Sequence, residues 1–229
     1  MKFLTPDWPA PKHVKAYTTL RNSWGNKDLS FHSQDTQLQT LLKLPSAPIW
    51  LDQAHTAIVL PATEISVGQV GDAIYTSTPN HACTILTADC LPVFICNRQG
   101  THVAIIHAGW RGLAAGIIEN TLAALHQPAE ELLVWLGPAI GPEKFEVGED
   151  VYAAFTSHHP ASSQGFTPYK PTKWLANLYL LAKLRLAEHG IQHIYGGQFC
   201  TYTQEELFYS YRRDGKTGRM AHSIWLETL

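Results

Sequence analysis

The fold is decided by the stretch Ala82–Gly112, which reads ACTILTADCLPVFICNRQGTHVAIIHAGWRG. Its short apolar runs are bounded by Pro, Asn or Gly and are rich in Ile, Val and Thr, a composition typical of strands. They predict strands over 82–87, 93–97 and 102–107. The pattern then changes to helical spacing, which predicts a helix over 112–126. Because several strands follow one another without a helix, the stretch favours a mixed sheet over a strict βαβ repeat.

The flanking sequence adds further elements to this centre. The same criteria predict strands over 72–77, 132–136, 191–195 and 223–226, a helix over 174–189, and loops over 21–26, 30–36 and 158–170. No internal repeat is evident, and none of the loops marks a domain boundary. We therefore expect an α/β fold with a mixed sheet flanked by helices, in a single domain that spans residues 1–229.

The composition and charge of the chain argue against several classes of protein. With 45% hydrophobic and 16% charged residues, the chain has the composition of a folded protein. A net charge of −2 without a basic block argues against nucleic-acid binding through a strong positive field. No apolar stretch has the length of a signal peptide or a membrane span. We expect a cytoplasmic protein without membrane or nucleic-acid partners, whose four cysteines are thiols or metal ligands.

Two residues of the central stretch combine into a candidate for chemistry. Cys90 lies in the run TADCLP, and His107 follows seventeen positions later, where a buried strand turns through glycines into a helix. Such a helix start favours anions, and Arg111 adds a permanent positive charge there. A thiolate and an imidazole at this place suit a zinc-assisted reaction on a phosphate-using substrate. The alternative is a glycine-rich connection with a buried histidine, and spacing alone does not separate the two.

A catalytic zinc site needs a third protein ligand, because three ligands plus an open position are usual. The candidates near in sequence are His55, His81 and His102. His102 lies five positions before His107 on the same predicted strand, so the two side chains should face opposite sides. The residues themselves leave the choice between His55 and His81 open.

Several motifs of this chain resemble the YfiH-type family, also called the laccase-domain or polyphenol oxidase family. The matching runs are WLDQAH (50–55), TADCLP (87–92), HAGWRG (107–112), GPAIGP (137–142), FEVG (145–148), CTYT (200–203), FYSYRRD (208–214) and TGRM (217–220). They extend from about position 48 to the end of the chain, and their combination in this order is highly specific. The resemblance is weaker near the N-terminus, where 21–32 is shortened and lacks the family's glycine-rich loop.

The resemblance implies a metal site, a fold and an activity. The family's ligands fall on His55, Cys90 and His107, which would also be the catalytic residues; Ala54 stands where the family has Val. The implied fold is one α/β domain of stacked mixed sheets flanked by helices. The implied activity is that of a zinc-dependent purine nucleoside phosphorylase, with copper as the alternative metal and adenosine deamination as a side activity. Its small-molecule substrates would be phosphate and adenosine, inosine, guanosine or methylthioadenosine.

The reaction also needs groups that bind phosphate and move a proton. Arg111, Arg212 and Arg219 are the candidates for phosphate, and Glu146 is a further candidate at the substrate. A general acid or base has two candidates, Glu146 and Asp89. Both carboxylates also have a structural reading, as a cap or as one partner of an ion pair.

Other functions compete with phosphorolysis. Two histidines and a cysteine resemble a blue-copper ligand set, which suits a copper-dependent polyphenol oxidase. Multicopper oxidases use His-x-His pairs, but no two of the twelve histidines here are two positions apart. The only methionines are Met1 and Met220, which argues against an axial methionine ligand. A Cys–His hydrolase with Cys90 as nucleophile and His107 as base is another alternative. Editing of peptidoglycan precursors, a role the family has also been given, and a purely structural zinc complete the set.

Overall fold

The predicted strands around Cys90 belong to two sheets of a computed structural model that describes residues 3–23, 35–157 and 159–228. The larger sheet has six strands in the order β12-β8-β6-β7-β4-β3. These strands are β3 (Val59–Pro61), β4 (Ala73–Thr76), β6 (Leu91–Asn97), β7 (Val103–Ala108), β8 (Leu132–Leu136) and β12 (His193–Gly196). The pairs β12–β8 and β3–β4 are parallel and the others antiparallel, so the sheet is mixed, as predicted.

A second, antiparallel sheet lies against the first. Its order is β1-β2-β13-β5, made of β1 (Phe3–Leu4), β2 (Val14–Thr19), β5 (Cys83–Thr87) and β13 (Met220–Leu226). Alternate side chains of β6 point to opposite faces, as in any strand. Phe94 therefore packs with Ile85 and Ile224 between the sheets, whereas Val93 and Ile95 face the helices. The chain passes from one sheet to the other between β5 and β6, the segment that holds Cys90.

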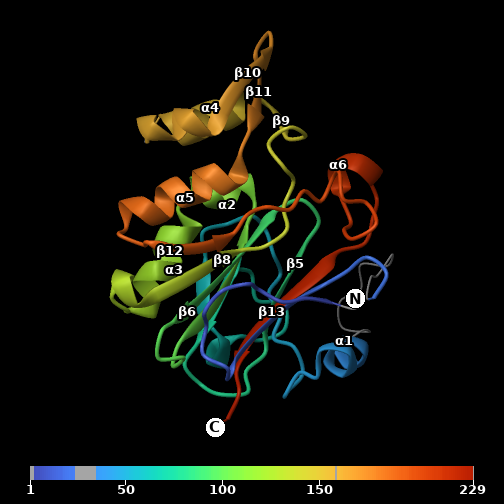
Figure 1. The fold of residues 1–229 in the computed structure, drawn as a ribbon, viewed down its shortest axis with the longest axis vertical. Helices are drawn as coiled ribbons and strands as arrows, with labels where there is room; N and C mark the ends of the chain where they lie inside the picture. The colour runs from blue at the N-terminus through green and yellow to red at the C-terminus, as the bar shows by residue number, and fades with distance from the viewer. Residues whose placement is uncertain (1–2, 24–34, 158, 229) are drawn as a thin grey trace.

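Helices cover the outer face of the six-stranded sheet (Figure 1). They are α2 (Trp110–Ala114), α3 (Ile117–Leu125) and α5 (Leu178–Glu188). The helix α4 (Glu149–Thr156) packs instead on β9 (Glu146–Gly148), β11 (Lys173–Ala176) and η4 (Pro160–Gly165), and α1 (Asp35–Leu42) packs on β5 and β13. The helix predicted over 112–126 is two helices, because Gly116 adopts a left-handed φ of 92° between them. Within the described part of the chain, every helix is too short or too polar to cross a lipid bilayer.

The region after position 145 differs most from prediction. A three-stranded antiparallel sheet, β10-β11-β9, combines β9 (Glu146–Gly148), β10 (Phe166–Lys170) and β11 (Lys173–Ala176). The predicted loop over 158–170 was therefore wrong for its later part, which forms the short helix η4 (Pro160–Gly165) and β10. The helix predicted from Trp174 starts at Leu178, because Asn177 caps it by accepting a hydrogen bond from the Leu180 amide at 3.0 Å.

The remaining elements are short. They are η2 (Ala62–Glu64), η3 (Ala129–Glu131) and α6 (Tyr211–Asp214). The predicted loop over 21–26 is a turn at 21–23, and α1 begins inside the predicted loop over 30–36. The rest of these two loops, and most of the shortened N-terminal segment, fall on residues 24–34, outside the described residues.

Candidate metal centre

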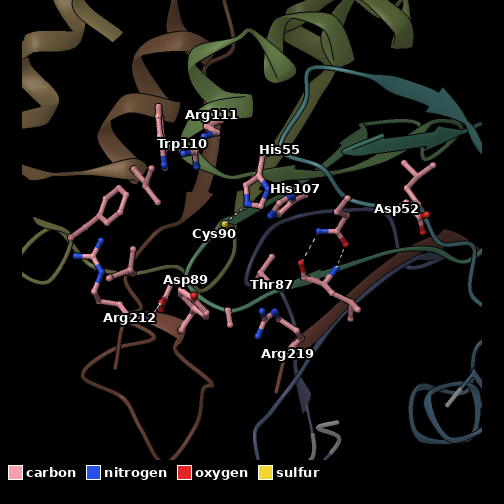
Figure 2. Close-up of a pocket in the computed structure, with 18 of the residues that line it drawn as sticks. Asp52, His55, Thr87, Asp89, Cys90, His107, Trp110, Arg111, Arg212 and Arg219 are labelled. Carbon is pink, nitrogen blue, oxygen red and sulfur yellow. Dashed lines mark hydrogen bonds between the residues drawn. The ribbon is translucent and has the colours of Figure 1, made fainter. Parts of the chain in front are cut away.

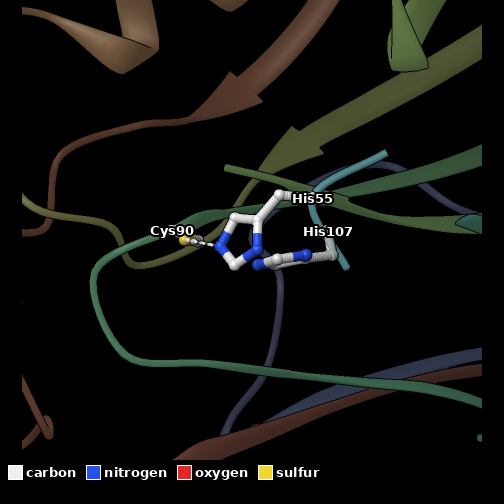
Figure 3. Close-up of side chains that lie close together, drawn as sticks. All are labelled: His55, Cys90 and His107. Carbon is white, nitrogen blue, oxygen red and sulfur yellow. Dashed lines mark hydrogen bonds between the residues drawn. The ribbon is translucent and has the colours of Figure 1, made fainter. Parts of the chain in front are cut away.

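Three side chains that are far apart in sequence meet at one place, His55, Cys90 and His107 (Figure 3). One ligand atom from each lies within 4.8 Å of the others, and the Cys90 Sγ is 3.8 Å from the His55 Nε2. The ring centroids of His55 and His107 are 4.8 Å apart. His107 is buried, Cys90 is half-buried and His55 is exposed, so the cluster has a closed side and an open side.

Each of the three residues is placed by a different element. His107 lies near the end of β7, where it pairs with Pro92 of β6. Cys90 lies in the connection between the two sheets, after Asp89, whose left-handed φ of 88° turns the chain into β6. His55 comes from the loop before β3 and has a left-handed φ of 59°. A φ above zero is uncommon for a residue with a side chain, so the surroundings must hold it in place.

The cluster passes a test of its fit to a metal ion. A separation of 3.8 Å between sulfur and nitrogen is compatible with one ion bound to both at about 2.0–2.3 Å. The backbone at Gly109 approaches so closely that a Cβ there would lie 2.7 Å from the His55 Cδ2 and 3.1 Å from the Cys90 Sγ. A cysteine with two histidines is a donor set that zinc and copper both accept.

Asp72, a residue that the sequence analysis did not single out, connects this cluster. Its carboxylate is fully buried and accepts a hydrogen bond from the His107 Nδ1 at 2.7 Å. It also accepts hydrogen bonds from the backbone amides of His55 at 3.0 Å and of Thr56 at 2.6 Å. The sequence carried one signal for it, an aspartate directly before an apolar strand, since carboxylates are almost never buried unless they are paired.

The charges of the cluster favour a thiolate and an ionised Asp72. Burial raises the pKa of Cys90, but His107 and His55 more than offset this and lower it below its ordinary value. Burial lowers the pKa of His107, yet Cys90 and Asp72 raise it above its ordinary value. Burial also raises the pKa of Asp72, and hydrogen bonds from His107 and Thr56 bring it down to about 2. A ready thiolate is the form in which cysteine binds metals.

The cluster opens into a pocket of about 570 Å³ that also contains all three predicted arginines (Figure 2). Arg111 and Arg219 lie on opposite sides of the three side chains in this view. Apolar and aromatic side chains line the rest of the wall, among them Trp110, Ile140, Phe145, Leu178 and Tyr211. The pocket thus offers positive charge and flat apolar surfaces next to the candidate ligands.

The arginines differ in what they contact. Arg219 donates from its Nη1 to the carbonyls of Thr217 and Gly218, and Arg212 donates to the carbonyl of Glu146 at 3.0 Å. Arg111 stacks its guanidinium 4.3 Å from the Trp110 ring centroid, and no acceptor among the described residues takes a hydrogen bond from it. Its donors are therefore the most available to an anion in the pocket.

Both predicted carboxylates are engaged in contacts with the protein, although Asp89 lies in the pocket wall (Figure 2). Asp89 accepts hydrogen bonds from the Thr201 hydroxyl at 2.6 Å and from the Arg212 amide at 2.7 Å. The Glu146 carboxylate pairs with Lys170 at 2.8 Å and is not part of the pocket wall, although its carbonyl holds Arg212. These contacts match the alternative role given for both carboxylates in the sequence analysis, that of a cap or of one partner of an ion pair.

The other histidines weighed as ligands lie outside the cluster. His102 contacts the neighbouring Thr101 hydroxyl, and His81 contacts the carbonyl of Pro79. A further residue without a predicted role is Gln53, which exchanges two hydrogen bonds with the backbone of Leu86 at 2.7 and 2.8 Å. This contact ties the His55 loop to β5, just before the segment that holds Cys90.

Comparison with known proteins gives consistent matches over the whole chain. The family described as multi-copper polyphenol oxidoreductase laccase matches residues 15–227. A Pseudomonas aeruginosa protein named purine nucleoside phosphorylase is 44% identical over 239 residues, 98% of each chain. The Escherichia coli protein named purine nucleoside phosphorylase YfiH is 44% identical over 241 residues, 98% of this chain and 99% of the other.

Solved structures match as well. The Neisseria meningitidis protein NMB0706, described as DUF152, superposes with a TM-score of 0.94 at 42% identity over 100% of both chains. YlmD from Geobacillus stearothermophilus superposes with a TM-score of 0.90 at 24% identity, covering 100% of this chain and 97% of the other, and this likeness concerns the fold alone. The predicted architecture, one α/β domain with stacked sheets and flanking helices, is thereby confirmed.

Proposed function

Because the chain belongs to the YfiH-type family of laccase-domain proteins, we propose that it is a metal-dependent purine nucleoside phosphorylase. The observation that carries this proposal is the cluster of His55, Cys90 and His107 at the wall of a pocket that also contains Arg111. The names of relatives that are 38–44% identical over nearly the full chain support it. The substrates would be a purine nucleoside and inorganic phosphate.

We propose His55, Cys90 and His107 as the ligands of a zinc ion. Two imidazoles and a thiolate suit zinc, which usually keeps one position open in catalytic sites. Bound there, zinc would supply Lewis acidity and lower the pKa of a bound water. Copper is the alternative that the family description suggests. A blue-copper site usually has an axial methionine, but Met220, the single methionine in the described residues, is buried and accepts a hydrogen bond from the Tyr209 amide.

The chain's own residues have two tasks in phosphorolysis, to hold phosphate and to provide surfaces for the purine. Phosphate must lie next to the anomeric carbon of the ribose, and Arg111 is the group that we assign to hold it, with Arg212 and Arg219 as further positive charges. The aromatic wall, Trp110, Phe145 and Tyr211, provides flat surfaces for a purine. As the bond from phosphate oxygen to the anomeric carbon forms and the bond from that carbon to the purine nitrogen breaks, the base leaves with a proton, which balances the proton lost by hydrogen phosphate. Glu146 would act indirectly, through its carbonyl contact with Arg212.

We also propose adenosine deamination as a side activity of the same site. Zinc deaminases combine histidine and cysteine ligands with a pocket that holds a purine or pyrimidine base. The reaction replaces the amino group at purine C6 by water-derived oxygen and releases ammonia. It consumes no phosphate, so it is separable from phosphorolysis by its products.

The proposal is tested by the products formed in the presence and absence of phosphate. Metal-analysed protein is incubated with adenosine, inosine and guanosine, and free base, ribose 1-phosphate and inosine are measured. We expect one zinc ion per chain. Free base should form only when phosphate is present. Oxidation of a phenol that needs added copper, with all nucleosides untouched, would overturn the proposal in favour of an oxidase.

A further inference from the structure

We propose that Asp72 is a positioning residue that fixes both candidate histidine ligands through one carboxylate. The inference rests on the proposed metal site, but not on the identity of the substrate. Asp72 lies directly before β4, and its fully buried side chain reaches the end of β7 on one side and the His55 loop on the other. Asp72 does not line the pocket, and among the described residues it makes no contact with the Cys90 sulfur.

The two oxygens of this carboxylate serve different parts of the site. Oδ1 accepts from the His107 Nδ1 at 2.7 Å and from the His55 amide at 3.0 Å. Oδ2 accepts from the Thr56 amide at 2.6 Å and from the Thr56 hydroxyl at 2.7 Å, with the Ala54 amide at 3.4 Å. Successive backbone amides of the loop thus converge on one carboxylate. They hold His55 in its left-handed conformation, which would otherwise be unfavourable.

The same carboxylate sets the tautomer of His107. An ionised carboxylate only accepts hydrogen bonds, so the His107 Nδ1 must carry a proton in this contact. The remaining nitrogen, Nε2, then has its lone pair free for a metal ion. Carboxylates that hold ligating histidines in this way typically change metal affinity by about 10–100-fold when they are removed.

An amide at position 72 could not replace the carboxylate. Asparagine has a single acceptor oxygen, whereas the donors of His107 and Thr56 lie on different oxygens of Asp72. An amide nitrogen would therefore face either the protonated Nδ1 of His107 or the amide of Thr56. In the first case His107 changes its tautomer, and in the second the His55 loop is released.

The test compares Asp72→Asn with Asp52→Asn, in which the same chemical change is made at an exposed carboxylate close to the same loop. Zinc affinity is measured by competition with a chromophoric chelator, and the His107 ring nitrogens of the metal-free protein are followed by 15N NMR at a pH at which the ring is neutral. We expect Asp72→Asn to bind zinc about 10–100-fold more weakly. Asp52→Asn should keep the zinc affinity and the Nδ1–H tautomer of the parent protein.

A second variant keeps the test informative if Asp72→Asn fails to fold. Thr56→Val removes one donor to Oδ2 and leaves His107 untouched, so it should weaken zinc binding about 3–10-fold while the His107 tautomer stays unchanged. The visible spectrum of the cobalt-substituted variant should change in step, which reports ligand geometry rather than overall stability.

The outcomes separate this inference from the proposed function. A zinc affinity within threefold of the parent in Asp72→Asn would overturn the positioning role. If Asp72→Asn does not fold, a zinc affinity within threefold of the parent in Thr56→Val would overturn it. The same holds for a neutral His107 ring in the metal-free parent protein that carries its single proton on Nε2. Zinc binding without phosphorolysis in the parent protein would instead count against the proposed function and leave the assignment of Asp72 standing.

Discussion

Cys90 supplies the only sulfur of the candidate ligand set, and a thiolate there is favoured by both neighbouring histidines. Removal of this ligand should reduce the zinc affinity more than the loss of a residue that only orients a ligand. In Cys90→Ala we expect zinc binding to fall by more than about 100-fold and phosphorolysis to fall with it. Atomic absorption after dialysis and a phosphate-dependent assay measure the two quantities.

The matched control for this change is Cys96→Ala. Cys96 is fully buried in the core between the sheets, away from the candidate ligands, so its loss should cost stability and leave the zinc content intact. Stoichiometric zinc retained in Cys90→Ala would contradict the ligand assignment.

Of the three arginines predicted to bind phosphate, Arg111 has the donors that are least engaged with the protein. Arg111→Ala should therefore raise the KM for phosphate, by about 10–100-fold if a charge-assisted hydrogen bond of about 1.5–3 kcal/mol is lost. Arg219→Ala should change it less, because the Arg219 side chain already donates to two carbonyls. Steady-state kinetics with phosphate as the varied substrate decide between them, and a larger effect for Arg219→Ala would reverse the assignment.

The turn between β7 and α2 shows how one element depends on close packing. A Cβ at Gly109 would lie 2.7 Å from the His55 ring, a distance that real side chains do not show. We expect Gly109→Ala to displace His55, to reduce zinc binding by at least about 10-fold and to leave the far-UV circular dichroism unchanged. The control is Gly148→Ala, where the nearest atom belongs to the flexible Asp150 side chain, and its zinc affinity should match that of the parent.

The contact between β13, β5 and β2 contains a buried histidine, His222, held by the hydroxyls of Thr18 and Thr87. Burial, aided by the charge on His107, lowers the pKa of His222 to about 3. In the unfolded chain the pKa of a histidine is about 6.5, so between these values only the unfolded state binds the proton. Stability is therefore lost as the pH falls from about 6.5 towards 3, by up to about 1.4 kcal/mol per pH unit from this residue.

Urea unfolding at several pH values measures this effect. The pH dependence between 6.5 and 4 should be weaker in His222→Asn, by up to the same slope, even if that variant is less stable throughout. The control His126→Asn changes an exposed histidine at the end of α3 and should keep the slope of the parent protein. An unchanged slope in His222→Asn would show that His222 is not buried in its neutral form.

At the scale of the whole molecule, the candidate ligands come from segments that lie far apart in the sequence. His55 comes from a loop, Cys90 from the connection between the two sheets, and His107 from β7. An ion that binds only the folded protein stabilises it by about 2.7 kcal/mol at 100 times the dissociation constant. For a chain of this length that corresponds to roughly 5–10 °C in Tm.

Calorimetry of the metal-free protein with and without zinc measures this stabilisation. We expect the rise in Tm to disappear in Cys90→Ala, which lacks one ligand, and to persist in Cys96→Ala. An equal rise in Cys90→Ala would place the ion elsewhere.

The cytoplasmic location and the absence of nucleic-acid and membrane partners stay predictions of the sequence.

The sequence alone determined the elements whose pattern is local. Strands β4, β5, β6, β7 and β8 follow from short runs of β-branched and apolar residues, and β8 matches its predicted bounds. The motifs around Cys90 and His107, together with the resemblance to a family, also led to His55. Local patterning failed at Trp174, because apolar spacing there suits a strand and a helix equally, and pairing with β9 and β10 decided the outcome.

Only the tertiary structure decided which strands share a sheet and what holds the ligands. Strands β5 and β6 are neighbours in sequence yet lie in different sheets, because side chains such as Phe94 and Ile85 bury their apolar surface between the layers. Asp72 is seventeen residues from His55 and thirty-five from His107, and its role appears only where their donors converge. A buried carboxylate must find its partners in space, and no local pattern in the chain records where those partners are.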